Sequence, residues 1–141
     1  MTRGGRCCGA LAVLLAASAA SCHDTTAPCA TPSRFAGSWR YVARQTSPGS
    51  ATISGTLVVK TGACRSLQGS LDAVERDAQG VTTRVAGALD GHEVDSSSIA
   101  FDVYLPSATR EHLGRLAGDS IAGSWIDGSA GGASGDFVAR R

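Results

Sequence analysis

The chain has 141 residues, and its 13 Lys and Arg against 12 Asp and Glu leave a formal net charge of +1. Because basic and acidic residues are almost equal in number, the chain has no basic field that would attract nucleic acid. Nucleic-acid binding is therefore excluded on electrostatic grounds. The length suffices for one hydrophobic core and is too short for two. We therefore expect one small domain.

The first 21 residues are predicted to be a bacterial export signal. Arg3 and Arg6 give a basic start, and the apolar run at 9–20 is too short to span a membrane permanently. Two cleavage sites compete in this region. Residues 17–19 fit an ordinary small-x-small site, whereas residues 19–22 resemble a bacterial lipobox ending in a cysteine.

The number of cysteines favours the lipoprotein site. Cys7 and Cys8 leave with the signal, so ordinary cleavage would leave three cysteines in an oxidising compartment. Lipidation of Cys22 instead leaves Cys29 and Cys64 as an even pair. We therefore expect a lipid anchor at Cys22 and a disulfide between Cys29 and Cys64.

Residues 22–33 are predicted to be the lipidated cysteine and a flexible tether, because this segment is polar and broken by Pro28 and Pro32. Several acyl chains, each worth roughly 0.8 kcal/mol per buried CH₂, would make the attachment to the membrane lasting. The residue after the lipidated cysteine is His23 rather than an aspartate. By analogy with Gram-negative lipoproteins, we expect a bacterial envelope protein in the outer membrane that faces the periplasm or the cell surface.

Residues 34–141 carry a repeated pattern of a glycine followed two positions later by a large apolar residue. Residues two apart on a strand share a face, and a glycine on the buried face lets a crowded sheet coil sharply. The pattern therefore predicts strands of a closed or nearly closed antiparallel barrel. Its seven copies begin at Gly37, Gly55, Gly69, Gly87, Gly114, Gly123 and Gly135.

Alternation of apolar and polar residues, with turn residues between the runs, predicts eight strands in chain order. The fourth strand is expected to end at the turn pair Asp90 and Gly91. The expected strands cover residues 35–44, 52–60, 67–73, 81–89, 99–105, 109–117, 120–125 and 137–139.

The segment from Thr109 to Ala117 is ambiguous between strand and helix. Leu113 and Leu116 are three residues apart, which suits a helical turn. Gly114 in the middle is unfavourable in a helix, and the tight turn at 118–119 follows. We therefore predict a strand.

Eight short strands without room for crossover helices predict an all-β, antiparallel, up-and-down barrel. The interior of such a barrel is just filled by side chains or holds one small ligand. In this topology the turn after the second strand returns to the end where the first strand begins, so Cys64 is expected near Cys29. A disulfide closing a loop of about 36 residues would contribute roughly 3 to 4 kcal/mol.

The residues 37–39, Gly-Ser-Trp, open the first strand, and the chain ends in Phe137-Val138-Ala139-Arg140-Arg141. These features resemble the calycin group, which includes lipocalins, fatty-acid-binding proteins and avidins. The resemblance implies a lipocalin- or avidin-like barrel that is closed at one end by Trp39. It also implies a cation–π contact between Trp39 and Arg140 or Arg141, worth about 0.5 to 2 kcal/mol.

Five aromatic residues are candidates for lining a ligand pocket. They either surround a small apolar cavity or simply fill the barrel, and both interpretations stay open. The candidates are Trp39, Tyr41, Phe101, Trp125 and Phe137.

Sequence patterns for metal binding or catalysis are weak. His23, His92 and His112 have no partner at metal-ligand spacing, so we expect no metal site. Ser98, His112 and Asp102 have the composition of a hydrolytic triad, but no nucleophile-elbow sequence surrounds the serine. Surface residues are the favoured interpretation of these three.

Asp90, Glu93 and Asp95 form an acidic cluster whose spacing fits no calcium-binding loop, so a solvated loop is favoured. We expect neither enzymatic activity nor a cofactor, because no acid–base constellation is visible.

Two function classes remain. The first is a membrane-tethered module whose barrel binds a small apolar or amphipathic ligand. The second is a protein-interaction module with a packed barrel, which uses its rim loops, particularly residues 129–134, to inhibit or scaffold an envelope protein. An open cavity would favour the first class, and a solid core with an ordered apolar rim would favour the second. The calycin resemblance favours ligand binding by analogy.

Overall fold

The computed structural model describes residues 32–141. The predicted signal at 1–21, the predicted anchor Cys22 and the predicted disulfide partner Cys29 lie outside the described residues, so these assignments stay predictions. Within residues 32–141, no helix is long and apolar enough to cross a membrane.

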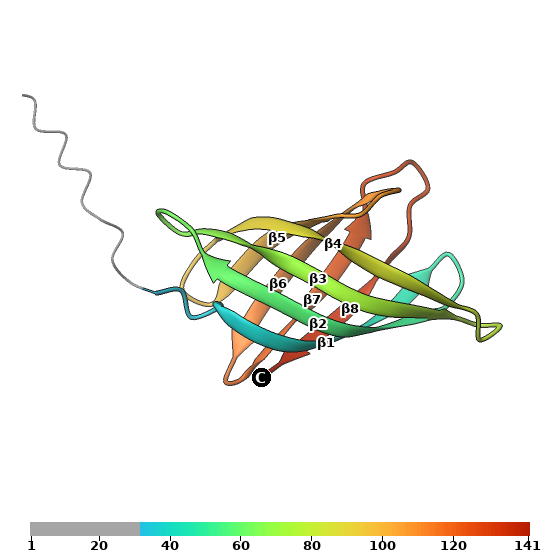
Figure 1. Cartoon of the computed structure of the whole chain (residues 1–141), viewed down its shortest axis with the longest axis horizontal. Helices are drawn as coiled ribbons and strands as arrows, with labels where there is room; N and C mark the ends of the chain where they lie inside the picture. The colour runs from blue at the N-terminus through green and yellow to red at the C-terminus, as the bar shows by residue number, and fades with distance from the viewer. Residues whose placement is uncertain (1–31) are drawn as a thin grey trace, which may run out of the picture.

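The described residues form one closed barrel of eight antiparallel strands (Figure 1). Each strand pairs with the next in the chain, and the last strand pairs with the first. This confirms the predicted all-β up-and-down barrel. The strands are β1 Gly37–Ser47, β2 Ala51–Thr61, β3 Ser66–Asp77, β4 Thr82–Glu93, β5 Ser98–Tyr104, β6 Thr109–Ala117, β7 Ser120–Asp127 and β8 Ser134–Arg140.

The ambiguous segment is strand β6. It pairs with β5 on one side and with β7 on the other, residue for residue. Gly114 lies opposite Gly123, and a Cβ at Gly114 would come within 2.8 Å of Ile121 and 2.9 Å of Phe137. The glycine therefore makes room for the core, and the pairing on both sides confirms that the segment is a strand.

The turn expected at Asp90 and Gly91 is wrong. Strand β4 continues through both residues to Glu93, and Gly91 pairs with Phe101 of β5. A Cβ on Gly91 would lie only 2.5 Å from the Phe101 Cβ. The glycine is used here for a close approach between strands, and the chain turns later, at 94–97.

Alternating side chains fill the barrel. In β1, Trp39, Tyr41 and Ala43 are buried, whereas Arg40 and Arg44, on the opposite face, are exposed. This alternation is the consequence of the two-residue period of a strand. The largest buried side chains come from all parts of the chain and include Phe35, Trp39, Tyr41, Ile53, Leu57, Leu67, Leu71, Ile99, Ile121 and Phe137.

The meander gives the barrel two ends with different structures. The chain enters at the first end, which also holds the turns at 62–65, 94–97 and 118–119. The second end holds the turns at 48–50, 78–81 and 105–108 and the loop at 128–133. In Figure 1 the first end lies on the left and the second on the right, where the β3–β4 hairpin projects. We call these the closed end and the open end.

Candidate functional site

The N-terminal segment closes the first end. Phe35 is fully buried, and its carbonyl accepts a hydrogen bond from Trp39 Nε1 at 2.8 Å. The Arg141 Cζ lies 4.5 Å from the centre of the Trp39 ring. Arg141 Nη2 also donates to the carbonyls of Arg34 and Ala36, at 2.7 and 3.0 Å. The last residue therefore holds the entering chain against the barrel.

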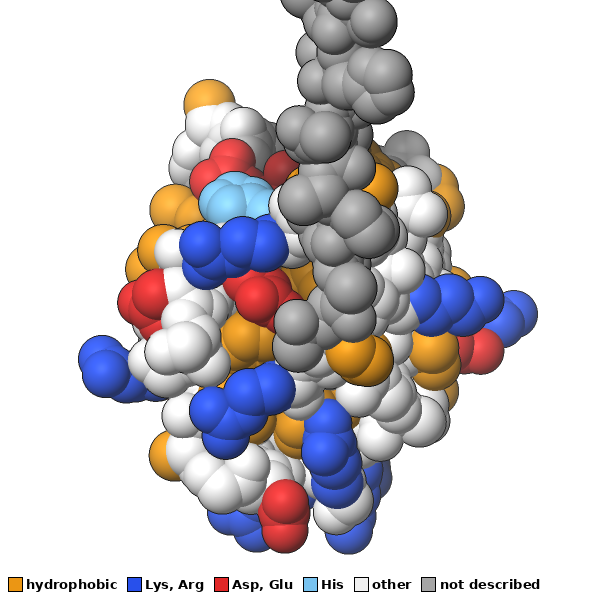
Figure 2. Space-filling view, turned by 90° about the vertical axis from the view of Figure 1, so that its left-hand side faces the viewer, with side chains coloured by type: hydrophobic (Ala, Val, Ile, Leu, Met, Phe, Trp, Pro, Cys, Tyr) orange, Lys and Arg blue, Asp and Glu red, His pale blue; other side chains and the backbone are white. Residues whose placement is uncertain are grey.

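Of the two terminal arginines, Arg141 makes the contact with Trp39. Arg140 is exposed, and it lines a shallow hollow on the outer face together with Arg40. Figure 2 looks onto the closed end and shows Lys and Arg side chains spaced around it.

The β2–β3 turn also belongs to the closed end. Cys64 in this turn is disulfide-bonded. The Ser33 backbone N–H donates to Thr61 Oγ1 at 3.2 Å, so the start of the described chain reaches the end of β2 beside this turn. Cys29 is not among the described residues, and its pairing with Cys64 stays a prediction.

Two polar side chains lie inside the barrel, and for one of them, His112, the expected surface position is wrong. Arg110 and His112 are 8% and 3% exposed. Both lie on β6 with the same parity as Gly114, whose inward position the glycine pattern already indicated. The alternation of β6 therefore indicates an inward position for both side chains, although polar side chains usually lie on the surface.

His112 bonds to two groups in the interior. Its Nδ1 lies 3.0 Å from the Arg110 carbonyl oxygen, and its Nε2 lies 3.0 Å from the Tyr41 hydroxyl. Because a carbonyl only accepts, Nδ1 carries the proton, and Nε2 accepts the hydrogen bond from Tyr41. Every polar atom of the neutral imidazole therefore has a partner.

Burial controls the ionisation of this pair. Burial lowers the pKa of His112 to about 4; the bond to the Arg110 carbonyl opposes this shift and the charge of Arg110 reinforces it. Burial also raises the pKa of Tyr41 above its usual range, with partial opposition from the charge of Arg110. Both side chains are therefore neutral at pH 7.

The rings around His112 form an aromatic cluster, made of Tyr41, Phe101, His112 and Phe137. Phe101 stacks on His112 with ring centres 4.4 Å apart, and Phe137 meets His112 edge-on at 5.2 Å. Tyr41 stacks on Phe137 at 5.7 Å. These contacts fill the middle of the barrel.

On the open-end side of the aromatic cluster, the Arg110 side chain crosses the interior of the barrel. Its Nε donates to Asp127 Oδ1 at 2.9 Å, and its Nη2 donates across the barrel to Glu75 Oε2 at 3.1 Å. Its Cζ lies 4.6 Å from the centre of the Trp125 ring. We call this arrangement of Arg110, Glu75 and Asp127 the Arg110 bridge. It covers Trp125, whose buried Nε1 has no hydrogen-bond partner in the described part of the chain.

A cavity of about 470 Å³ opens beside the Arg110 bridge. It lies between β4 and the β5–β6 turn, and we call it the slot. Val85, Leu105 and Pro106 supply apolar surface, and the charged groups of the bridge lie at one side. The full lining is Glu75, Thr83, Arg84, Val85, Ala86, Leu105, Pro106, Ser107 and Arg110.

The slot exists because neighbouring strands differ in length. β4 has 12 residues and β5 has 7, and the two pair only from Ala88 to Glu93. The chain leaves the sheet after Tyr104, where the Leu105 N–H donates to the Ala108 carbonyl at 2.9 Å. The barrel is therefore split between β4 and β5 at its open end.

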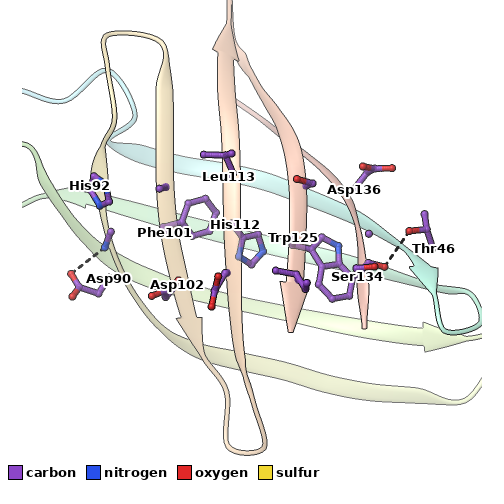
Figure 3. A pocket seen from close by; sticks show the side chains of 16 residues that line it. Thr46, Asp90, His92, Phe101, Asp102, His112, Leu113, Trp125, Ser134 and Asp136 are labelled. Atoms are coloured by element: carbon purple, nitrogen blue, oxygen red, sulfur yellow. Dashed lines mark hydrogen bonds between the residues drawn. The ribbon is translucent and has the colours of Figure 1, made fainter. Parts of the chain in front are cut away.

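A second hollow of about 630 Å³ crosses the outer face of β4 to β8 (Figure 3). We call it the outer groove. Asp90, Asp102 and Glu111 lie opposite one another on β4, β5 and β6 along one wall. Leu113 and Ile126 are 58% and 52% exposed beside them. The groove therefore combines negative charge with apolar surface.

The residues considered for a hydrolytic triad are not brought together. His112 faces the interior, Asp102 lies in the wall of the outer groove, and Ser98 pairs with Arg115 near the closed end. His112 is therefore not a surface residue, and the three side chains do not form a triad.

The acidic cluster near the β4–β5 turn is divided among separate partners. Glu93 lies 3.9 Å from the Arg65 guanidinium. Asp95 accepts hydrogen bonds from the Ser97 N–H and hydroxyl, and the backbone bond in particular lowers the pKa of Asp95 to about 2. Among residues 32–141, no group of three His, Cys, Asp or Glu side chains is arranged to hold a metal ion.

The five aromatic candidates all lie inside the barrel, each with 2% or less of its surface exposed. Trp39 belongs to the closed end, whereas Trp125 lies under the Arg110 bridge. Tyr41, Phe101 and Phe137 belong to the aromatic cluster between them. The residues that line the slot, above all Glu75 and Arg110, are not among the predicted site residues.

Comparison with known proteins shows similarity in fold. No protein-family model matches the chain, and no curated protein matches it in sequence. The redesigned β-barrel mFAP1, solved bound to DFHBI, is 11% identical with a TM-score of 0.61, over 75% of this chain and 94% of that chain. The barrel EF1p2_mFAP2b, also bound to DFHBI, is 11% identical with a TM-score of 0.59, over 75% and 92%. A de novo designed fluorescence-activating β-barrel is 16% identical with a TM-score of 0.55, over 76% and 93%. At these identities the likeness shows the β-barrel fold.

Proposed function

We propose that this chain is a bacterial envelope lipoprotein whose barrel binds a small amphipathic ligand in the slot at its open end. The observation that carries the proposal is the slot itself, a cavity of about 470 Å³ with apolar surface on one side and the Arg110 bridge on the other. Ligand sites are typically concave and apolar with a few fixed polar groups. The slot has this composition.

The Arg110 bridge gives the slot a polar floor. The two carboxylates of Glu75 and Asp127 hold the guanidinium in place from two strands, so its position is fixed before a ligand arrives. A polar head group of the ligand would bond to this floor. The apolar part would lie against Val85 and Leu105, where water is displaced at a gain of about 25 cal/mol per Å².

The fold neighbours are consistent with a barrel of this kind holding a small molecule. Both mFAP1 and EF1p2_mFAP2b bind DFHBI. Because the identities are 11%, their binding residues are not transferred to this chain, and the chemistry of its ligand is inferred from its own slot.

The proposed anchor fits this orientation. The described chain begins at the closed end, next to Phe35, and the slot lies at the opposite end. A lipid on Cys22 would therefore attach the protein to the membrane through its closed end and leave the slot accessible. Metabolic labelling with a palmitate analogue tests the anchor: Cys22→Ser should abolish the label, and labelling that persists would contradict it.

Binding is tested with the neutral, environment-sensitive dye Nile red and the chain from residue 22 onward, carrying Cys22→Ser to keep it free of lipid. Ala86 and Ala122 both lie on the outer faces of their strands, but only Ala86 borders the slot. Ala86→Arg therefore places a long side chain at the mouth of the slot, and Ala122→Arg places the same side chain away from it. We expect a saturable fluorescence increase that Ala86→Arg abolishes and Ala122→Arg leaves intact. Equal dye binding in all three proteins would refute the slot as the site.

The outer groove favours a second candidate function, that of a protein-interaction module. Leu113 and Ile126 are half exposed on it, and partners commonly cover such apolar surface. In-cell crosslinking separates the two functions. A partner that uses the groove would be lost with Leu113→Asp and kept with Ala86→Arg, and the reverse pattern would assign the partner to the slot.

A further inference from the structure

We propose that the free edge of β4, residues 82–86, binds an extended segment of a partner protein as an added strand, with a Lys or Arg side chain of that segment directed into the slot. This inference concerns the backbone along the slot. It goes beyond the small-ligand function, which rests on side chains.

The edge is defined by the pairing of β4. This strand pairs with β3 from Thr82 onward, but its other side pairs with β5 only from Ala88. In an antiparallel strand, alternate residues direct both their N–H and C=O groups to the same side. Alternate residues of 82–86 therefore present donors and acceptors to the slot, and no strand among residues 32–141 pairs with them there.

The end of β5 explains why this edge stays open. The Tyr104 carbonyl oxygen approaches β4 so closely that a Cβ at Gly87 would lie 2.2 Å from it. Beyond this point the chain turns away, and Pro106 has no N–H to contribute to a ladder. The edge therefore begins where β5 stops.

The other incomplete edge of the described barrel is covered. Residues 37–39 of β1 extend beyond the pairing with β8, and Arg141 lies over them, in contact with Trp39. Residues 82–86 have the sequence Thr-Thr-Arg-Val-Ala, in which Arg84 is the one charged residue and in which no proline or bulge protects the free edge. Its β-branched residues favour an extended partner.

The walls of the slot select a single extended segment. β4 forms one wall, and residues 105–107 form the other. A partner segment of about five residues, roughly 17 Å long, matches the free edge. This is the strand-addition mode of peptide recognition.

The charge of the floor selects the side chain. Alternate side chains of an added strand would point inward, towards the Arg110 bridge. Two carboxylates meet one guanidinium there, so the bridge has an excess of one negative charge, and Glu75 keeps 24% of its side chain exposed. Arg84, also on the slot, is neutralised by Asp72 at 3.0 Å. An inward Lys or Arg complements this field.

The test uses a six-residue peptide of alternating lysine and valine, blocked at both ends, with the chain from residue 22 carrying Cys22→Ser. A control peptide has the same side chains but N-methylated backbone amides. We expect the first peptide to bind in calorimetry and to slow amide exchange at alternate residues of 82–86. Loss of two or so hydrogen bonds should weaken the N-methylated peptide roughly tenfold or more.

Equal binding of the two peptides, or no binding of either, would overturn the inference. Glu75→Gln should weaken the lysine peptide but not a peptide in which alanine replaces lysine, and equal weakening of both would remove the charge argument. Slow amide exchange at residues 82–86 without peptide would indicate another occupant of the edge. Slow exchange that depends on protein concentration would identify a second copy. Slow exchange that is lost when residues 22–33 are deleted would identify the chain itself.

The same samples separate this inference from the proposed function. Dye binding in the slot without peptide binding overturns strand addition alone. Peptide binding without dye binding overturns the small-ligand function alone.

Discussion

Acidification should destabilise this barrel through one buried side chain, His112. In the folded state burial lowers the pKa of His112 to about 4, whereas in an unfolded chain this pKa has its ordinary value of 6.5. Between these two values the unfolded state binds a proton that the folded state does not. Stability from the neutral imidazole is therefore present above pH 6.5 and is lost as the pH falls towards 4.

The size of the effect follows from the two pKa values. One pKa unit corresponds to about 1.36 kcal/mol, so the folded state loses about 2 kcal/mol by pH 5 and about 3 kcal/mol by pH 4 through this group alone. The side chain is 3% exposed, so solvent screening does not reduce this value much. A loss of this size is a large fraction of the stability of a small domain.

The assay is urea unfolding followed by far-ultraviolet circular dichroism at pH 7, 6 and 5. His112→Phe keeps a ring in the stack with Phe101 but cannot titrate. At pH 7 the variant should be less stable by about 1 to 3 kcal/mol, because the Tyr41 hydroxyl loses its acceptor.

By pH 5 the stability difference between the two proteins should narrow by about 2 kcal/mol, because only the wild type is destabilised through residue 112. The exposed-site variant His92→Gln controls for removal of a histidine. Parallel pH curves for the wild type and His112→Phe would refute the reasoning.

Three further variants test the packing of the barrel. Arg141→Ala removes a cation–π contact and two hydrogen bonds to carbonyls, and it should lower the free energy of unfolding by about 1 to 3 kcal/mol. Arg140→Ala should change it by less than about 0.5 kcal/mol, and equal losses would contradict the assignment of the contact. Gly91→Ala would place a Cβ 2.5 Å from a backbone oxygen of β5 and should cost about 1 to 3 kcal/mol in thermal or urea unfolding. Gly128→Ala, where the nearest atom is 3.6 Å away, is the matched control, and a neutral effect of both substitutions would contradict the close approach at Gly91. Cys64→Ala should cost roughly 3 to 4 kcal/mol if the disulfide closes the predicted loop of about 36 residues, and an unchanged urea midpoint would exclude that pairing.

The barrel was predictable because its constraints are local. A glycine two positions from a large side chain marks an inward face wherever the sheet coils, and this pattern located seven of the eight strands. The same rule places Arg110 and His112 inside through their parity with Gly114. The polar character of these two side chains instead favours the surface, because a buried polar or charged group needs partners that the local sequence does not reveal.

Those partners are distant in the chain. Arg110 bonds to Glu75, 35 residues earlier, and to Asp127, 17 residues later. The slot likewise depends on a mismatch between the lengths of β4 and β5, and a prediction that ended β4 at Asp90 hides this mismatch. A glycine in an Asp-Gly pair can form a turn, and it can equally allow two strands to approach closely. At Gly91 the neighbouring Phe101 requires the close approach, and the local sequence does not show this contact.

The central claim is that the open end of the barrel holds a ligand. Native mass spectrometry of the protein purified gently from the cells that make it tests this claim most directly, with native and denatured masses compared for the wild type and Ala86→Arg. The account predicts an excess mass in the native wild type that disappears on denaturation and is absent from Ala86→Arg. An excess that is equal in both proteins, or no excess in the wild type, would contradict it.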